Sequence, residues 1–329
     1  MDALGLLVKD DTGATLDFLA PNLLSSHADL SIPEAREYVK DALRAMVTDY
    51  GIDGWMADFG EWMPLGAVND GGIDPVVFHN TYPVEWHRLT REVMDEVRPD
   101  GDWVSFGRSG WTGVHEVSMI HWIGDQETDW SVTDGLPTVV PAMLNLGISG
   151  IPYVTHDIGG FSGTTADPTT KELFLRWTEL GAFTPYMRTH EGADRDNNWS
   201  WEFDTETTDH FRRFALIHQV LGPELRALAT AAETDSAPLV RHLMLEFPSD
   251  PGCLGISDQY MLGGSLLVAP VVEEGAIARD VYFPAGATWY DVWSGTPYAG
   301  GQTTNISAPI GSPPVFSRDA DRADIRAIP

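Results

Sequence analysis

Cysteine, lysine and long apolar runs are scarce in this sequence, which has one cysteine and three lysines in 329 residues. With Cys253 alone, an internal disulfide framework is excluded, and we expect a reducing, cytoplasmic location. No apolar stretch approaches the ~20 residues of a membrane-spanning helix. The first ten residues lack the basic segment and apolar core of a signal peptide. We therefore expect no membrane partner.

Basic residues are also few, since 20 lysines and arginines stand against 49 acidic residues, for a formal net charge of −29. Such a charge repels nucleic acid, so we expect no nucleic-acid partner. It is tolerated best in concentrated salt, where the Debye length falls to about 3 Å at 1 M. A halophilic host is therefore our hypothesis.

The first two-thirds of the sequence alternates short apolar strands with helical patterns. Strands are expected at residues 52–57, 103–106, 122–123 and 151–155. One helix is expected to follow a capping box made by Ser31 and Glu34. Further helices are expected at residues 83–97, 136–146, 173–180 and 211–229. Regular alternation of this kind favours an α/β fold with a parallel sheet.

Polar residues gather where the predicted strands end, as they do in (β/α)₈ barrels, whose active sites are built at the carboxyl ends of the strands. An open doubly wound sheet concentrates function at one switch point instead. We therefore favour a partial (β/α)₈ TIM barrel with about five βα units. Because a closed barrel needs eight units, we expect this sequence to be a fragment.

From residue 236 onward the sequence changes to β-rich runs separated by glycine and proline turns. Strands are expected within residues 239–247, 265–272, 280–283 and 289–292. These runs indicate a C-terminal antiparallel β domain. We expect residues 1–235 to form the C-terminal portion of a catalytic barrel, and residues 236–329 to form a β-sandwich-like domain.

Two acidic residues, Asp58 and Asp125, end two of the predicted strands among glycine and aromatic residues. An unpaired buried carboxylate costs several kcal/mol, so two of them at one sheet edge suggest chemistry. Such a pair suits glycoside hydrolysis, in which one carboxylate attacks or stabilises the anomeric carbon and the other delivers a proton. The alternative is that each caps loop amides. The histidines show no paired metal-ligand spacing and no phosphate loop is present, so we expect neither metal nor cofactor.

The residues around both acids resemble glycoside hydrolase family 31, the retaining α-glycosidases. Residues 51–61 are similar to its nucleophile segment and residues 121–126 to its acid/base segment. Segments similar to other parts of the family are residues 107–110, 157–161, 186–190 and 258–270. The resemblance implies that Asp58 is the nucleophile and that Asp125 is the general acid, then the base. The substrate-binding residues that it implies are Arg108, Trp122, Gln126, Asp157, Phe161 and His190.

Within the family, residues 56–64 and 124–130 look most similar to sulfoquinovosidases, which release the 6-sulfonated sugar of plant sulfolipids. Phe161 departs from that subgroup, where we expect a sulfonate-binding tyrosine. We therefore expect a small carbohydrate substrate and an α-sulfoquinovoside first, with α-glucosides and α-xylosides as alternatives. A truncated, non-catalytic product and a sugar-binding module in the β region stay open, as does the oligomeric state.

Each candidate binding residue also has a structural explanation. Arg108 could pair with a loop acid, Asp157 could cap the following glycine turn, and His190 could be a hydrogen-bonded wall residue. Arg188 is expected to pair with a carboxylate at a strand end, and Glu61 is expected to support the Asp58 loop rather than to react.

Overall fold

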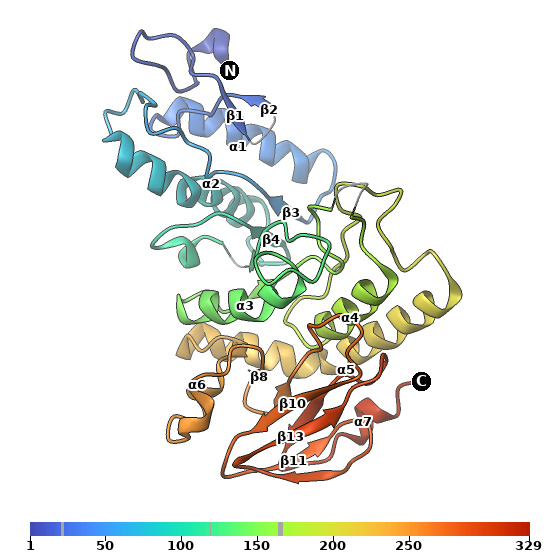
Figure 1. Ribbon diagram of the computed structural model, residues 1–329. Coiled ribbons are helices and arrows are strands. Elements are labelled where there is room, and N and C mark those ends of the chain that lie inside the picture. The colour runs from blue at the N-terminus through green and yellow to red at the C-terminus, as the bar shows by residue number, and fades with distance from the viewer. Residues whose placement is uncertain (21–22, 119, 164–166) are drawn as a thin grey trace. The chain divides into compact units, whose positions relative to one another are not determined.

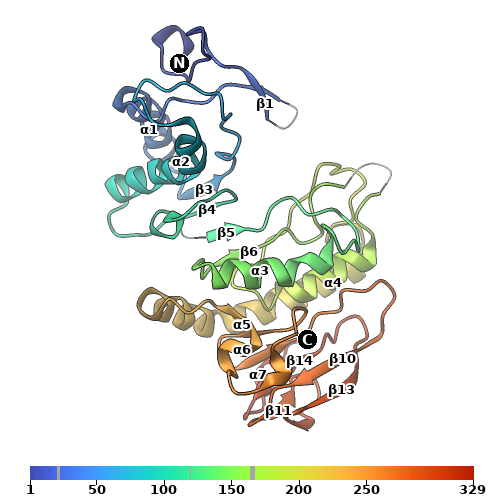
Figure 2. The same cartoon turned by 60° about the vertical axis from the view of Figure 1, so that its left-hand side comes forward.

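The structure is a computed structural model that describes residues 1–20, 23–118, 120–163 and 167–329 (Figures 1 and 2). The chain divides into two compact units, Met1–His121 and Trp122–Pro329. The division falls inside the strand β5 (Ile120–Trp122).

The first unit carries three parallel strands and two long helices. Its elements are η1 (Asp2–Leu4), β1 (Phe18–Ala20), β2 (Leu23–Ser25), α1 (Pro33–Thr48), β3 (Gly54–Ala57), α2 (Pro75–Val97), β4 (Val104–Gly107), η2 (Val114–Glu116) and the start of β5. Strands β3, β4 and β5 pair in parallel, while β1 and β2 form an antiparallel hairpin. Helices α1 and α2 pack side by side (Figure 1).

The helix cap predicted at residue 31 and the helix start predicted at residue 83 are both wrong, and each error has a local cause. The capping box is absent, because the Ser31 hydroxyl donates to Asp29 and no side chain caps α1, whose N-cap is Ile32. Helix α2 begins at Pro75 and runs through Pro83. Asp74 sets this earlier start, since its carboxylate accepts from the amides of Val76 and Val77.

The second unit opens with the remaining strand and helix alternation. Its elements up to residue 235 are η3 (Leu136–Thr138), α3 (Val139–Ile148), β6 (Val154–Thr155), α4 (Lys171–Gly181) and α5 (Thr205–Asp235). Helix α4 is buried along nearly its whole length, and α5 packs beside it. In both views α5 lies between the other two helices and the C-terminal strands (Figures 1 and 2).

The C-terminal part of the second unit is an antiparallel β structure, as expected. Its elements are β7 (Val240–Arg241), α6 (Leu243–Glu246), η4 (Pro251–Cys253), β8 (Tyr260–Leu262), β9 (Leu266–Val268), β10 (Ala278–Phe283), β11 (Thr288–Asp291), β12 (Pro297–Ala299), β13 (Gln302–Ser307), β14 (Val315–Arg318) and α7 (Ala323–Arg326). Six strands form one sheet in the order β12-β11-β14-β9-β8-β7, and β10 pairs with β13. Buried aromatic residues, including Phe283, Trp289 and Phe316, fill the core.

The strand expected at residues 239–247 is only partly present. It ends at Arg241, and the helix α6 follows. His242 starts that helix, because its Nδ1 accepts from the amide of Met244 at 3.1 Å. Among the described residues, no helix has both the length and the apolar character needed to cross a bilayer. The same residues contain no group of three or more His, Cys, Asp or Glu side chains that could hold a metal ion.

Candidate active site

In the first unit, the parallel register of β3 and β4 places two candidate residues next to each other. Ala57 and Gly107 are paired positions, so Asp58 and Arg108 each follow the last paired residue of their strand. Parallel strands end at the same edge, and the two side chains meet there. The Nη2 atom of Arg108 lies 3.2 Å from Oδ1 of Asp58.

The Arg108 guanidinium bridges two carboxylates in this first unit. Besides Asp58, it pairs with Glu61, whose Oε1 accepts from Nε of Arg108 at 2.9 Å. The side chains of Asp58, Glu61 and Arg108 are 23%, 33% and 18% exposed, so solvent reaches all three. Asp58 therefore has a cationic donor beside it and an open side, which is the setting that an ionised nucleophile needs.

The backbone around Asp58 is strained and hydrogen-bonded. Phe59 has a φ of 63°, in the left-handed region that bulky residues rarely adopt. Its amide donates to Oδ1 of Asp58 at 2.6 Å, and the Arg108 guanidinium lies over its ring at 5.4 Å from the centroid. Trp86 in α2 donates from Nε1 to the Asp58 carbonyl at 2.9 Å. These contacts hold the residue after β3 in one conformation.

In the second unit, hydrogen bonds join the segments that contain the other candidates. The carbonyl of Gln126 accepts from the Phe161 amide at 2.8 Å. The amide of Ile158 donates to the carbonyl of Arg188 at 3.1 Å, and Ile158 bridges in parallel with Thr189. Three segments that are distant in sequence, around residues 125, 158 and 189, therefore form one cluster.

Asp157 and Arg188 form a buried ion pair at the centre of this cluster. The Asp157 side chain is 1% exposed, and Arg188 also lies over the Trp122 ring at 5.8 Å from the centroid. His156 is fully buried, so desolvation first and the Arg188 charge second lower its pKa to about 3. The indole of Trp177 donates to Nδ1 of His156 at 3.0 Å. The expected pairing of Arg188 with a strand-end carboxylate is present.

Asp125 itself is half-buried, and its neighbours are mostly buried. Its carbonyl accepts from the Ser162 hydroxyl at 3.0 Å. Trp122 and Gln126 are 2% and 4% exposed. The side-chain Nε2 of Gln126 donates to the carbonyl of Ile123 at 3.0 Å. This contact fixes the turn that carries Asp125.

Two acidic residues that follow Asp125 in sequence differ in their surroundings. Glu127 is exposed, yet desolvation first, and then Asp129 and other acidic neighbours, raise its pKa. The Asp129 carboxylate accepts from the amide of Ser131 at 2.8 Å. The segment that follows Asp125 is therefore surrounded by negative charge.

His190 and Phe161 lie edge to face, with ring centroids 5.0 Å apart. Burial first, and then the Arg188 charge, lower the pKa of His190, while Glu191 opposes the shift. Its Nδ1 accepts from the Gly192 amide at 2.9 Å, so a neutral His190 carries its proton on Nε2. That N–H group is suited to donate to a sugar hydroxyl.

Sequence reasoning missed the side chains that support the candidates. Trp86 is recognisable in the sequence only as one of the apolar residues of a helix, yet its indole holds the Asp58 carbonyl. His156, which precedes Asp157 in the sequence, forms a buried pair with Trp177. No signal in the sequence identifies these contacts, because each depends on a helix residue that meets a strand end far away in the chain.

The comparisons with known proteins fit this geometry. Residues 1–225 match the model of the glycosyl hydrolases family 31 TIM-barrel domain, and residues 236–320 match the family 31 C-terminal domain. This chain belongs to glycosyl hydrolase family 31. The expected fold is therefore confirmed as part of a family 31 TIM barrel followed by a C-terminal antiparallel β domain.

Several family 31 relatives are sulfoquinovosidases. The chain is 38% identical over 316 residues to the sulfoquinovosidase of Escherichia coli, covering 95% of this chain and 46% of that protein. It is 36% identical over 291 residues to the sulfoquinovosidase of Agrobacterium fabrum, covering 88% and 44%. A family 31 sulfoquinovosidase structure from E. rectale, in complex with an aza-sugar inhibitor, matches with a TM-score of 0.94 and 34% identity, covering 99% and 49%. The chain thus spans about half the length of these relatives.

Proposed function

We propose that this chain carries the reacting carboxylates of a retaining α-glycosidase that acts on α-sulfoquinovosides. The observation that carries the proposal is the cluster of Asp58, Arg108 and Glu61 at the carboxyl edge of β3 and β4. A carboxylate that stays accessible while a guanidinium and an amide stabilise its charge is suited to attack the anomeric carbon.

The reaction proceeds in two displacements. An oxygen of Asp58 attacks the anomeric carbon, the bond to the leaving oxygen breaks, and Asp125 gives its proton to that oxygen. A water molecule then attacks the same carbon, Asp125 takes a proton from it, and the bond to Asp58 breaks. We propose that six further residues hold the sugar, namely Arg108, Trp122, Gln126, Asp157, Phe161 and His190.

The choice of a sulfonated sugar rests on the relatives. Identity is 38% to the Escherichia coli sulfoquinovosidase and 31% to a probable glucan 1,3-alpha-glucosidase from Arabidopsis thaliana. One observation favours an α-glucoside or an α-xyloside instead, because Phe161 offers no hydroxyl to a sulfonate. A panel of aryl α-sulfoquinovoside, α-glucoside and α-xyloside separates these substrates.

The experiment that tests the mechanism uses the purified chain with an aryl α-glycoside. We expect the first product to keep the α configuration in a proton NMR time course. A 2-fluoro glycosyl fluoride should label Asp58, as peptide mass spectrometry would show, and Asp58→Ala should remove the labelling. Release of the β product would exclude the covalent intermediate, and labelling of another residue would reassign the nucleophile.

The role of Asp125 needs a separate test. Asp125→Ala should slow the hydrolysis of a substrate with a poor leaving group by about 10²–10⁴-fold, the usual contribution of general acid catalysis. It should slow an activated aryl substrate much less, because that leaving group needs no proton. The matched control is Asp129→Ala, in the same segment. Equal losses on both substrates would remove Asp125 from the acid role.

A further inference from the structure

Arg108 sits on a short turn after β4, and a histidine of α2 packs against that turn. His87 is 2% exposed, and its Nε2 lies 2.9 Å from the carbonyl oxygen of Ser109. A Cβ atom added to Gly107 would lie 2.2 Å from Cε1 of His87. The imidazole therefore fills the space that a side chain at position 107 would need, and it contacts both residues that flank Arg108.

His121 forms the other side of this contact. It is the register partner of Gly107 in the pairing of β4 with β5, and its ring meets that of His87 edge to face at 5.8 Å between centroids. Burial lowers the pKa of both histidines, that of His121 to about 4. A neutral His87 whose Nε2 faces a carbonyl carries its proton on Nε2, so it donates to Ser109.

The turn held by His87 is linked to the Asp58 loop. The Ser109 hydroxyl donates to the carbonyl of Phe59 at 2.5 Å. Arg108 pairs with Asp58 and lies over the Phe59 ring. A displacement of Ser109 would therefore move both the guanidinium beside Asp58 and the strained residue that follows it.

We propose that His87 is a positioning residue: it fixes the turn Gly107–Ser109 so that Arg108 stays paired with Asp58. The inference rests on the proposed glycosidase function and adds a residue to its support. In this role His87 acts through Arg108, by its contacts with Gly107 and Ser109. The geometry that carries the inference lies entirely within the first unit.

The test is a double-variant cycle on the whole chain, read out by activity and by thermal unfolding. His87→Ala should lower kcat/KM by up to about 10²-fold, the scale expected when a reacting group is misplaced by about 1 Å. His87→Gln keeps an N–H donor and should restore most of the activity. In an Arg108→Ala background, His87→Ala should cost no further activity, yet lower the unfolding midpoint as before.

The results that overturn the proposal are defined by the same cycle. If His87→Ala lowers kcat/KM by the same factor with and without Arg108, His87 does not act through Arg108. If it lowers only the unfolding midpoint and leaves kcat/KM unchanged, its role is packing alone. His115→Ala is the matched control, since His115 is an exposed histidine of the same unit and should change neither quantity.

A second measurement does not depend on activity. In ¹⁵N-labelled protein, the side-chain Nε–H resonance of Arg108 should shift in His87→Ala and not in His115→Ala, and histidine spectra should show His87 protonated on Nε2. An Arg108 resonance that is insensitive to His87 would refute the inference even in an active enzyme. A chain that shows these signals but hydrolyses no α-glycoside would refute the proposed function and leave the positioning of Arg108 intact.

Discussion

The two units each contain an arginine paired with an aspartate at a strand end, but the pairs differ in burial. In the first unit, Asp58 is 23% exposed and Arg108 is 18% exposed. In the second, Asp157 is 1% exposed and Arg188 is 16% exposed. Water can therefore stabilise the charge of Asp58 if the Arg108 guanidinium is lost. The buried Asp157 depends on the protein to stabilise its charge.

This difference separates a carboxylate that solvent reaches, Asp58, from one whose charge the protein itself must stabilise, Asp157. Removing one partner of a buried pair typically costs about 3–5 kcal/mol, because a charge is left in a medium of low polarity. An ion pair that solvent reaches contributes at most about 1 kcal/mol. We therefore expect loss of Arg188 to reduce stability most and loss of Arg108 to reduce activity most.

The largest expected effect is on stability. Arg188→Leu should lower the free energy of unfolding by about 3–5 kcal/mol, and Arg108→Leu by about 1 kcal/mol or less. Urea unfolding followed by tryptophan fluorescence measures both. Combining Arg188→Leu with Asp157→Asn removes the buried charge and should recover part of the loss. Equal losses for the two arginine variants would show that burial does not distinguish the pairs.

A second buried pair in the second unit makes stability depend on pH. Arg176 and Glu179 are both 1% exposed, and desolvation, opposed first by Arg176, raises the pKa of Glu179 to about 7. His210, Arg213 and the amide of Gly311 also face this carboxylate. Because the folded state holds the Glu179 proton more tightly than the unfolded state, the contribution of this group to stability is full below about pH 4.5 and is lost as pH rises to about 7.

Glu179→Gln tests that dependence. A shift of this size corresponds to a stability change on the order of 3 kcal/mol between the two pH limits. The variant should lose this part of the pH dependence when urea unfolding is measured at pH 5 and pH 8. Glu172→Gln, on the same helix, is the matched control and should keep the profile. A Glu179→Gln variant that shows the same change in stability between pH 5 and pH 8 as the wild-type chain would contradict the assignment.

Strand and helix alternation was enough to predict the fold class and the position of Asp58. The reason is physical: a parallel strand delivers its next residue to a fixed edge, so Asp58 and Arg108 had to be neighbours once their strands were recognised. The pairing of Gln126 with Phe161 follows the same logic. Residues that lie on strand ends are therefore predictable in position.

Contacts made by helix residues were not predictable in this way. In the sequence, nothing distinguishes His87 from the other residues of a predicted helix. Only the tertiary packing of α2 brings it to Gly107. Ser31 shows the same limit on a smaller scale, because its hydroxyl had two possible partners and bonds to Asp29 instead of capping the helix. Competition between local partners is decided by packing, which a single sequence does not contain.

The next largest expected effect is on activity, and it sharpens the contrast between Arg108 and Arg188. Arg108→Lys keeps the charge but loses the planar fork that bridges Asp58 and Glu61. A lost hydrogen bond to a charged group is worth about 1.5–3 kcal/mol, so kcat/KM should fall by about 10- to 150-fold. The unfolding midpoint should change little. A lysine variant with wild-type kinetics would show that charge alone is sufficient at position 108.

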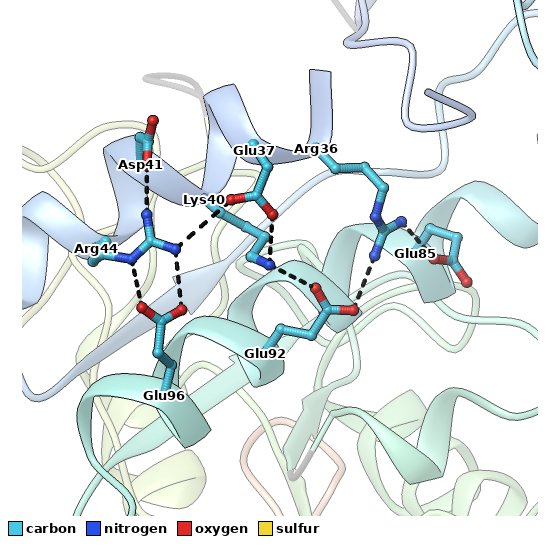
Figure 3. A network of polar contacts seen from close by, with 8 residues as sticks. All are labelled: Arg36, Glu37, Lys40, Asp41, Arg44, Glu85, Glu92 and Glu96. Carbon is cyan, nitrogen blue, oxygen red and sulfur yellow. Dashed lines mark hydrogen bonds and ion pairs between the residues drawn. The ribbon is translucent and has the colours of Figure 1, made fainter. Parts of the chain in front are cut away.

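The smallest expected effect concerns a network of partly exposed ion pairs within α1 and between α1 and α2 (Figure 3). The participants are Arg36, Glu37, Lys40, Asp41, Arg44, Glu85, Glu92 and Glu96. Hydrogen bonding to Glu37 first, together with Glu92, raises the pKa of Lys40. Because each such pair is worth about 0.2–1 kcal/mol and Lys40 makes two of them, Lys40→Met should cost less than about 2 kcal/mol at low salt.

Salt distinguishes these exposed pairs from the buried ones. At 1 M salt the Debye length is about 3 Å, so the cost of Lys40→Met should shrink there, while that of Arg188→Leu should persist. The wild-type chain responds to salt through two opposing effects, the screening of these pairs and the screening of the repulsion within a chain of net charge −29. If the screening of repulsion dominates, the stability of the wild-type chain rises with salt. The stability of Lys40→Met then approaches that of the wild-type chain. A wild-type chain that loses stability in salt would count against our hypothesis of a halophilic host.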